Sequence, residues 1–313
     1  MISLRNHVIS IAAVFLALAV GVVLGSTSLS NRVLGGLADD RANLSKQVTD
    51  LQSRQTDLSG RLTDADRYAL ATGPLAVRGA LDGKSVVLVT TADAKTTDRD
   101  GVAALLRAAG ATVTGELQLT DAFTDPTKSD QLRSLVTRLL PAGVQLPTAS
   151  DPGTLAGGLI GPLLLLDKTS GKPQASADET AAALTGLASG GYVRQGQGLH
   201  AAQLALVLTG GSVAGNAAAD RAAVIARFAT QVQRSGGGTV LAGRTGSADN
   251  FGPLAVVRAD GATTSVLSTV DDLDIAAGQV VTVLALRDAA AGRSGNYGTA
   301  GNAQAPAPVQ QTG

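Results

Sequence analysis

The sequence opens with an uncharged apolar run, VISIAAVFLALAVGVVLG, which covers the 18 residues 8–25. As a helix, this run extends about 27 Å at about 1.5 Å per residue, which is close to the thickness of a bilayer hydrocarbon core. Eleven of its residues are Val, Ile, Leu or Phe, a composition that favours membrane insertion by about 5 kcal/mol. We therefore expect residues 1–28 to form a membrane anchor.

A cleaved signal sequence is the alternative for the same segment. The apolar core of a signal usually has about 7–15 residues and ends at small residues, and Val23, Gly25 and Ser26 would suit a cleavage site. The greater length of the run favours an uncleaved anchor. Because Arg5 and the terminal amine precede the run, the excess of positive charge on the cytoplasmic side predicts a single pass with the C-terminal body outside the cytoplasm.

Composition excludes several classes of function. The 25 basic residues balance the 25 acidic ones, so nucleic-acid binding has no electrostatic support. The chain has no Cys, which excludes disulfides, thiolate nucleophiles and zinc–thiolate sites. With 2% aromatic residues and no Trp, the core has to be built from Val, Leu, Ile and Ala.

A heptad pattern follows the apolar run. Leu37, Leu44, Leu51 and Leu58 are seven residues apart and occupy position d of a coiled coil predicted for residues 29–73. The a positions are then Leu34, Arg41, Val48, Gln55 and Leu62. Polar residues at a discourage higher oligomers, so we expect a parallel homodimer, with one amphipathic helix folded back on the body as the alternative. Gly73-Pro74 is predicted to end this helix.

From residue 80 to 290, short β-branched runs alternate with amphipathic segments. Strands are predicted at 85–91, 111–120, 204–210, 236–243 and 263–270, and helices at 98–109, 128–140, 176–189, 217–235 and 275–288. This alternation predicts a three-layer α/β domain with a mostly parallel sheet, Rossmann-like or flavodoxin-like.

Two segments of this region need separate interpretation. The apolar stretch at 155–166 contains Pro162 and is too short to cross a bilayer, so we expect a buried helix or the start of a strand. The tail from 291 to 313 is rich in Gly, Asn, Gln, Ala and Pro, and is predicted to be disordered.

Two glycine-rich segments are candidate anion sites. Gly196-x-Gly198-x-x-Ala201, with Asp220 about 20 residues further on, matches a dinucleotide fingerprint, but it precedes a strand instead of following one. We expect no nucleotide there. Gly210-Gly211-Ser212-x-x-Gly215 follows a strand and precedes a helix, where backbone N–H groups can bind an anion. It lacks the Lys of a P-loop, and a tight turn explains it equally well.

The acidic residues Asp271, Asp272 and Asp274 follow a predicted strand. Three carboxylates at the carboxyl edge of a sheet can hold a hard cation. The alternative, which we favour, is that they cap the helix that follows.

Catalytic and copper-binding residues are scarce. The only two His are His7, beside the anchor, and His200, next to an apolar run and expected at the surface or rim. There is no G-x-S-x-G motif, so we predict no enzyme, no catalytic residues and no cofactor. Met1 is the single Met, so one chain offers no three-ligand copper site. Two copies of His200 could meet in a dimer, and we assign no metal ligands.

Several stretches, in order along nearly the whole chain, carry a family resemblance. They are MISLRNHVISIAAVFLALAVGVVLGS at the start, GKSVVLV from Gly83, RFATQVQRSGGGTVLAGRTGSA from Arg227, STVDDLDIAAGQVVTVLAL from Ser268 and GNYGT from Gly295. The chain resembles the actinobacterial family of copper-transport outer-membrane proteins.

The resemblance implies copper transport and copper ion homeostasis that keep intracellular copper low, an outer-membrane location, and a channel in the envelope with copper ion as the transported species. A transmembrane barrel would show repeated segments of about ten residues with aromatic girdles, and this chain does not. Conduction would then require oligomers joined through the coiled coil predicted for residues 29–73. The rival interpretation is a scaffolding protein of the cell envelope whose α/β head binds a protein or glycan. A third is an enzyme domain that has lost its site.

Overall fold

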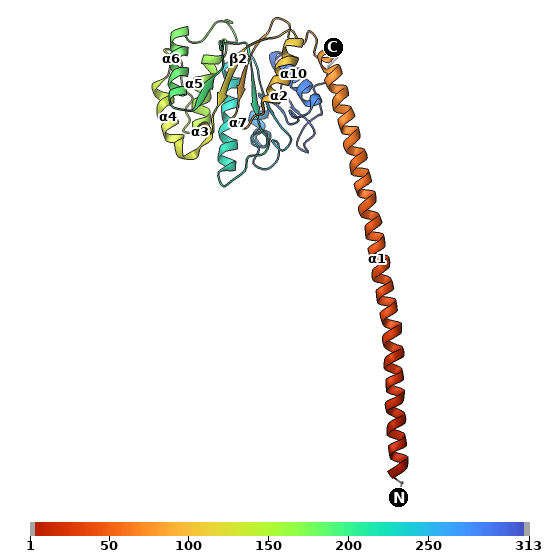
Figure 1. Cartoon of the computed structure of the whole chain (residues 1–313). Coiled ribbons are helices and arrows are strands. Elements are labelled where there is room, and N and C mark those ends of the chain that lie inside the picture. Colours follow the sequence, from red (N-terminus) through yellow and green to blue (C-terminus); the bar gives the residue numbers. More distant parts are fainter. Residues whose placement is uncertain (1–3, 310–313) are drawn as a thin grey trace. The chain divides into compact units, whose positions relative to one another are not determined.

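The structure is a computed structural model that describes residues 4–309, with side chains described at 6–25 and 40–309. The chain divides between Ala65 and Asp66 into two compact units. One contains most of a long helix, and the other is an α/β globular unit (Figure 1).

Helix α1 (Leu4–Ala76) is continuous over 73 residues. Its early part, Asn6–Gly25, is 20 residues long, apolar enough to cross a membrane, and unburied by the rest of the chain. Among the described residues this is the one helix that meets those criteria. The segment agrees with the predicted anchor in length, position and composition, and it supports membrane association.

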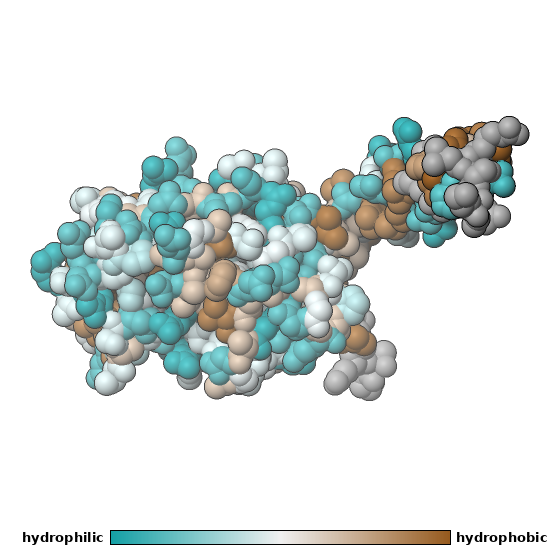
Figure 2. Space-filling model, turned by 90° about the horizontal axis from the view of Figure 1, so that it is seen from below, coloured by the Kyte–Doolittle hydropathy of each residue, from teal (hydrophilic) through white to brown (hydrophobic). Residues whose placement is uncertain are grey.

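An apolar stripe runs along the next part of α1. Its members lie at a and d of the predicted heptad and are 46% to 64% exposed: Leu44, Val48, Leu51, Leu58 and Leu62. Figure 2 shows hydrophobic residues on this helix, whereas the face of the globular unit seen there is mainly hydrophilic. Leu34 and Leu37 lie outside the residues whose side chains are described. The stripe faces solvent in the single chain, and the coiled coil stays a prediction.

The charged residues of α1 follow the same seven-residue spacing. Arg54 pairs with Asp50 at 2.9 Å, and Arg61 pairs with Asp57 at 3.0 Å. Such exposed pairs four residues apart stabilise a helix by a few tenths of a kcal/mol each. Both pairs lie off the apolar stripe and leave it free for a partner helix.

The prediction that Gly73-Pro74 ends the long helix is wrong by about one turn. The helix continues to Ala76 and contains Pro74. Its final turns belong to the globular unit, because the Ala276 N–H donates to Asp66 Oδ1 at 2.6 Å and Val77 is fully buried. Pro74 removes one backbone hydrogen bond of the helix and its ring crowds the carbonyl four residues earlier, so packing within the globular unit outweighs its local preference.

One sheet organises the globular unit. Its order is β3-β2-β1-β4-β5-β6-β7, and every pair is parallel except β2 with β3. The strands are β1 (Ser85–Thr90), β2 (Thr112–Leu119), β3 (Val193–Gln195), β4 (Leu204–Thr209), β5 (Thr239–Gly243), β6 (Ser268–Val270) and β7 (Asn296–Tyr297). The mostly parallel α/β prediction is confirmed. The series β2-β1-β4-β5-β6 has the doubly wound order 2-1-3-4-5, which reverses direction between β1 and β4.

Helices cover both faces of this sheet, as alternate strand residues require. Val86 and Leu88 pack into one core with α2 (Thr96–Ala108) and α10 (Ala276–Ala290). Val87 and Val89 pack into the other with α4 (Ser129–Arg138), α5 (Pro152–Leu164), α6 (Ala177–Ser189) and α7 (Ala218–Ser235). The short elements are α3 (Asp121–Thr124), η1 (Pro126–Lys128), α8 (Pro253–Arg258) and α9 (Gly261–Thr264).

The apolar stretch at 155–166 forms most of the buried helix α5, as one of the two expectations had it. This helix lies against α7 with glycines at every fourth position: Gly153, Gly157 and Gly161. A Cβ atom on Gly157 would lie 2.8 Å from the carbonyl oxygen of Phe228. The absence of side chains along this row therefore sets the distance between the two helices.

Two predicted segments differ from the structure. In the stretch predicted as a strand at 263–270, only Ser268–Val270 is a strand, since Asp260 caps the helix α9 by accepting from the Ala262 N–H at 3.0 Å. The tail predicted to be disordered at 291–313 contributes β7, whose Tyr297 pairs with Val270. Residues 310–313 lie outside the described residues.

Candidate functional site

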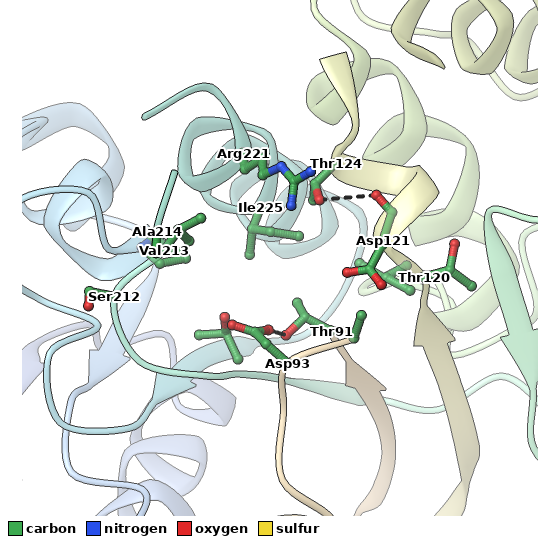
Figure 3. A pocket seen from close by; sticks show the side chains of 14 residues that line it. Thr91, Asp93, Thr120, Asp121, Thr124, Ser212, Val213, Ala214, Arg221 and Ile225 are labelled. Carbon is green, nitrogen blue, oxygen red and sulfur yellow. Dashed lines mark hydrogen bonds between the residues drawn. The ribbon is translucent and has the colours of Figure 1, made fainter. Parts of the chain in front are cut away.

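A cavity of about 240 Å³ lies at the carboxyl ends of β1, β2 and β4. This is the point where the strand order reverses, and doubly wound sheets bind their ligands there. Its lining comes from the ends of all three strands and from α3, α7 and α8 (Figure 3). The topology of the sheet therefore marks this cavity as the first candidate site.

Two acidic residues reach the cavity from the first two strand ends. Asp93 follows β1, and its carboxylate accepts a short hydrogen bond from the buried Thr91 hydroxyl. Asp121 begins α3 directly after β2. The Thr120 hydroxyl beside it donates to the Gly191 carbonyl at 2.6 Å. These contacts hold the loop backbone, while the Asp121 side chain stays exposed to the cavity and solvent.

The third wall is the Gly210-Gly211-Ser212-x-x-Gly215 segment. It joins β4 to α7 as predicted, and Ser212, Val213 and Ala214 line the cavity. Gly215 has a φ of 97°, a conformation that favours glycine, so the tight-turn interpretation also holds. Arg221 of α7 lines the same cavity, and its positive charge supports the anion-binding interpretation.

The cavity suits binding of a polar molecule. Its lining combines one guanidinium, two carboxylates and several hydroxyls with the apolar side chains of Leu119, Val213, Ile225 and Pro253. No imidazole, amine or thiol is among its lining residues, so the Ser and Thr hydroxyls lack the neighbouring base most often used to activate a nucleophile.

Sequence reasoning missed Asp93, Asp121, Thr209 and Arg221 as site residues. A signal was present for the first three, because each lies at or within a few residues of the end of a predicted strand. No such signal marks Arg221 in the sequence, because this residue lies within helix α7 and not at the end of a strand. Only the strand order shows that these residues share one edge of the sheet.

The acidic group after β6 does not form the cation site that was considered. The Asp271 carboxylate pairs with Arg258 at 2.6 Å, and both side chains are 2% exposed. Asp274 instead accepts from the Thr245 N–H at 2.9 Å. Among the described residues no group of three or more His, Cys, Asp or Glu could hold a metal. The capping interpretation is wrong as well, because Ile275 is the residue that precedes α10, and the carboxylate that accepts from the first N–H of that helix belongs to Asp66.

This acidic group instead fastens the C-terminal segment to the sheet. Asp271 accepts from the N–H groups of Thr299 and Ala300, at 2.9 and 3.2 Å. Arg258 donates to the Tyr297 carbonyl at 2.8 Å. These contacts explain why a polar tail is ordered: its backbone polar groups replace water around a buried ion pair.

Asp271 and Asp272 titrate differently because their surroundings differ. Burial, and after it a hydrogen bond with Asp271, raise the pKa of Asp272 to about 7. Burial also acts to raise the pKa of Asp271, but hydrogen bonds from Asp272 and Arg258 outweigh it and lower that pKa. Below about pH 7 the pair therefore holds one proton, carried by Asp272, and it loses that proton as the pH rises through 7.

This arrangement makes the stability of the globular unit depend on pH. Between the unfolded pKa of Asp272 and its folded pKa, the folded state binds more protons, so stability falls as pH rises. From about pH 5 to about pH 8 we expect the free energy of unfolding to drop by about 2 to 3 kcal/mol. Urea titrations across this range measure the slope. Asp272→Asn should flatten it, and the control Asp178→Asn, at an exposed position on α6, should keep it; an unchanged slope in Asp272→Asn would contradict the assignment.

The remaining sequence candidates stay apart from the cavity. Gly196 and Gly198 follow the edge strand β3 and open no helix, as expected for a chance match. His200 is exposed, as predicted, with Nδ1 2.6 Å from the Gly198 carbonyl oxygen. His7 lies exposed near the start of α1.

Comparison with known proteins identifies relatives of this chain. The family model described as "Copper transport outer membrane protein, MctB" matches residues 1–308. The chain belongs to the MctB family. Copper transporter MctB of Mycobacterium tuberculosis is 38% identical over 304 residues, covering 96% of each chain. The protein of the same name from Mycobacterium leprae is 39% identical over 306 residues, covering 95% of this chain and 96% of its own.

Proposed function

We propose that this protein takes part in copper transport and copper ion homeostasis and limits intracellular copper. The observation that carries the proposal is the match to MctB proteins, which spans residues 1–308 and therefore covers the predicted anchor, the predicted coiled-coil segment and the globular unit. We further propose a single pass by α1, with the C-terminal unit outside the cytoplasm and the protein in the outer membrane. The positive charge before the span favours that orientation.

Copper passage would need more than one chain. One helix cannot enclose a path across a membrane, and the described residues contain no three-ligand metal cluster. The apolar stripe of α1 offers the means of association, because it is exposed and follows a heptad for several turns. Arg54 and Arg61 occupy position g of this heptad, and in a parallel pair each faces an e position of the partner helix, Ser59 and Asp66 respectively. In an antiparallel pair they would face each other, so a parallel homo-oligomer is favoured.

The double variant Leu44→Ser and Leu51→Ser is expected to convert the oligomer to a monomer. Both side chains are 63% exposed in the single chain, and burying each in a seam contributes about 1.5 to 3 kcal/mol. Sedimentation in detergent measures the mass. The matched control, Lys46→Ser and Ser53→Ala, changes the outer face and should leave the mass unchanged; an unchanged mass in the Leu variant would reject the coiled coil.

Copper flux in liposomes tests the function itself. Full-length protein should release trapped copper ions faster than empty liposomes, and the Leu44→Ser, Leu51→Ser variant should not. The second readout is the copper content of cells that lack the gene for this protein, which we expect to be higher than in cells that carry it. Absence of both effects would overturn the transport proposal and favour a scaffolding protein whose globular unit binds an envelope partner.

A further inference from the structure

The charged side chains that line the cavity at the carboxyl ends of β1, β2 and β4 have few partners within the protein. The Arg221 guanidinium lines the cavity and makes no side-chain hydrogen bond or salt bridge to a residue that the structure describes, although its charge, after the hydrogen bonds from Thr127, helps to lower the pKa of Asp125. The Asp121 carboxylate is likewise unpaired within the described residues, and Asp93 accepts only from Thr91. Figure 3 shows the Arg221 side chain on one side of the cavity, with Asp121 and Asp93 on other sides. The cavity thus presents separated positive and negative groups.

A buried hydroxyl completes this lining. Thr209, at the end of β4, is 1% exposed and lines the cavity. Its hydroxyl has no hydrogen-bond partner among the described residues. Because Thr209 borders the cavity, its hydroxyl is available to hydrogen-bond a ligand or an ordered water there.

The β4–α7 loop adds unbonded donors. None of the backbone N–H groups of residues 211–214 donates to an acceptor within the described residues. Consecutive backbone N–H groups before a helix can donate hydrogen bonds to a carboxylate or phosphate. Arg221 lies on the second turn of that same helix and lines the cavity beside them.

We propose that this cavity binds a small zwitterion of the size of an amino acid or dipeptide. A simple anion would suit Arg221 and the loop but would meet the carboxylates of Asp93 and Asp121. A simple cation would suit the carboxylates but would meet the guanidinium. A molecule with both charges matches both sides, and 240 Å³ is smaller than the sites that hold drug-sized ligands. This site is separate from the copper role proposed above and does not depend on it.

Binding of L-alanyl-L-alanine to the full-length protein in detergent micelles tests the proposal. The dipeptide is compared by isothermal titration calorimetry with N-acetylalanine, which lacks the ammonium, and alaninamide, which lacks the carboxylate. We expect the dipeptide to bind at least about tenfold more tightly than either analogue, because one charge-assisted contact is worth roughly that much. Arg221→Gln should weaken dipeptide binding about tenfold, and Thr209→Val should weaken it by a smaller factor.

Arg227→Gln is the matched control. Arg227 lies on the same helix, six residues further on, and does not line this cavity, so its replacement should leave binding unchanged. Circular dichroism confirms that each variant is folded. Equal binding of all three compounds, binding of inorganic phosphate alone, no binding, or an Arg221→Gln variant that binds like the unchanged protein would each overturn the proposal.

Discussion

Replacing Gly157 with Val is expected to lower the free energy of unfolding of the globular unit by about 3 kcal/mol or more. A Cβ atom at this position would lie 2.8 Å from both the Phe228 carbonyl oxygen and Gln231 Cβ on α7. The carbonyl cannot move away without bending α7, whose Phe228 and Val232 are fully buried. The added side chain therefore separates two helices that cover the same face of the sheet. Urea unfolding followed by the near-ultraviolet circular dichroism of the tyrosines measures the loss.

The same substitution at Gly261 is the control for this prediction. A Cβ atom there meets nothing within 4 Å, and the residue begins the exposed helix α9. Gly261→Val should change stability by less than about 1 kcal/mol. Comparable losses for the two variants would mean that the glycine row is not what sets the α5–α7 distance.

The sequence predicts the buried elements of this fold well because their uniformly apolar side chains are stable only in the interior of the protein. β1 and β4 are short, apolar and rich in Val and Leu, and both lie fully inside the sheet. The failures come where local preference meets tertiary contacts. The stretch from Thr263 to Val266 is rich in β-branched residues, but the Asp260 cap turns its first part into a helix. Pro74 breaks helices in isolation but here lies in a turn packed on the globular unit.

The candidate site was predictable only in part. The Gly210–Gly215 loop was recognisable because a strand precedes it and a helix follows it. Its partners were not, since Asp93 and Asp121 come from segments about 100 residues earlier and join the loop only when β1 lies between β2 and β4. The acidic group at 271–274 shows the opposite error. Its spacing suited a cation, but Arg258, which the spacing does not reveal, neutralises Asp271.

Removing this arginine is expected to have the other large effect. Arg258→Met leaves the Asp271 carboxylate buried without its cation, which typically costs about 3 to 5 kcal/mol. It also removes the donors to the Tyr297 carbonyl and to Asn302 Oδ1, both at 2.8 Å. Urea unfolding should show the lower stability. Limited proteolysis should show early cleavage after residue 295, because the C-terminal segment loses its side-chain attachment to the sheet before the remaining strands open.

A surface arginine separates the burial effect from the loss of any ion pair. Arg133 pairs with Asp130, and their side chains are 39% and 85% exposed. Arg133→Met should therefore cost less than about 1 kcal/mol and leave the C-terminal segment protected. If Arg258→Met and Arg133→Met were equally stable, the buried Arg258–Asp271 pair would contribute no more to stability than the exposed Arg133–Asp130 pair. The order of the polar tail would then rest on the pairing of β7 with β6 and on the bond between Asn302 Nδ2 and the Ala248 carbonyl.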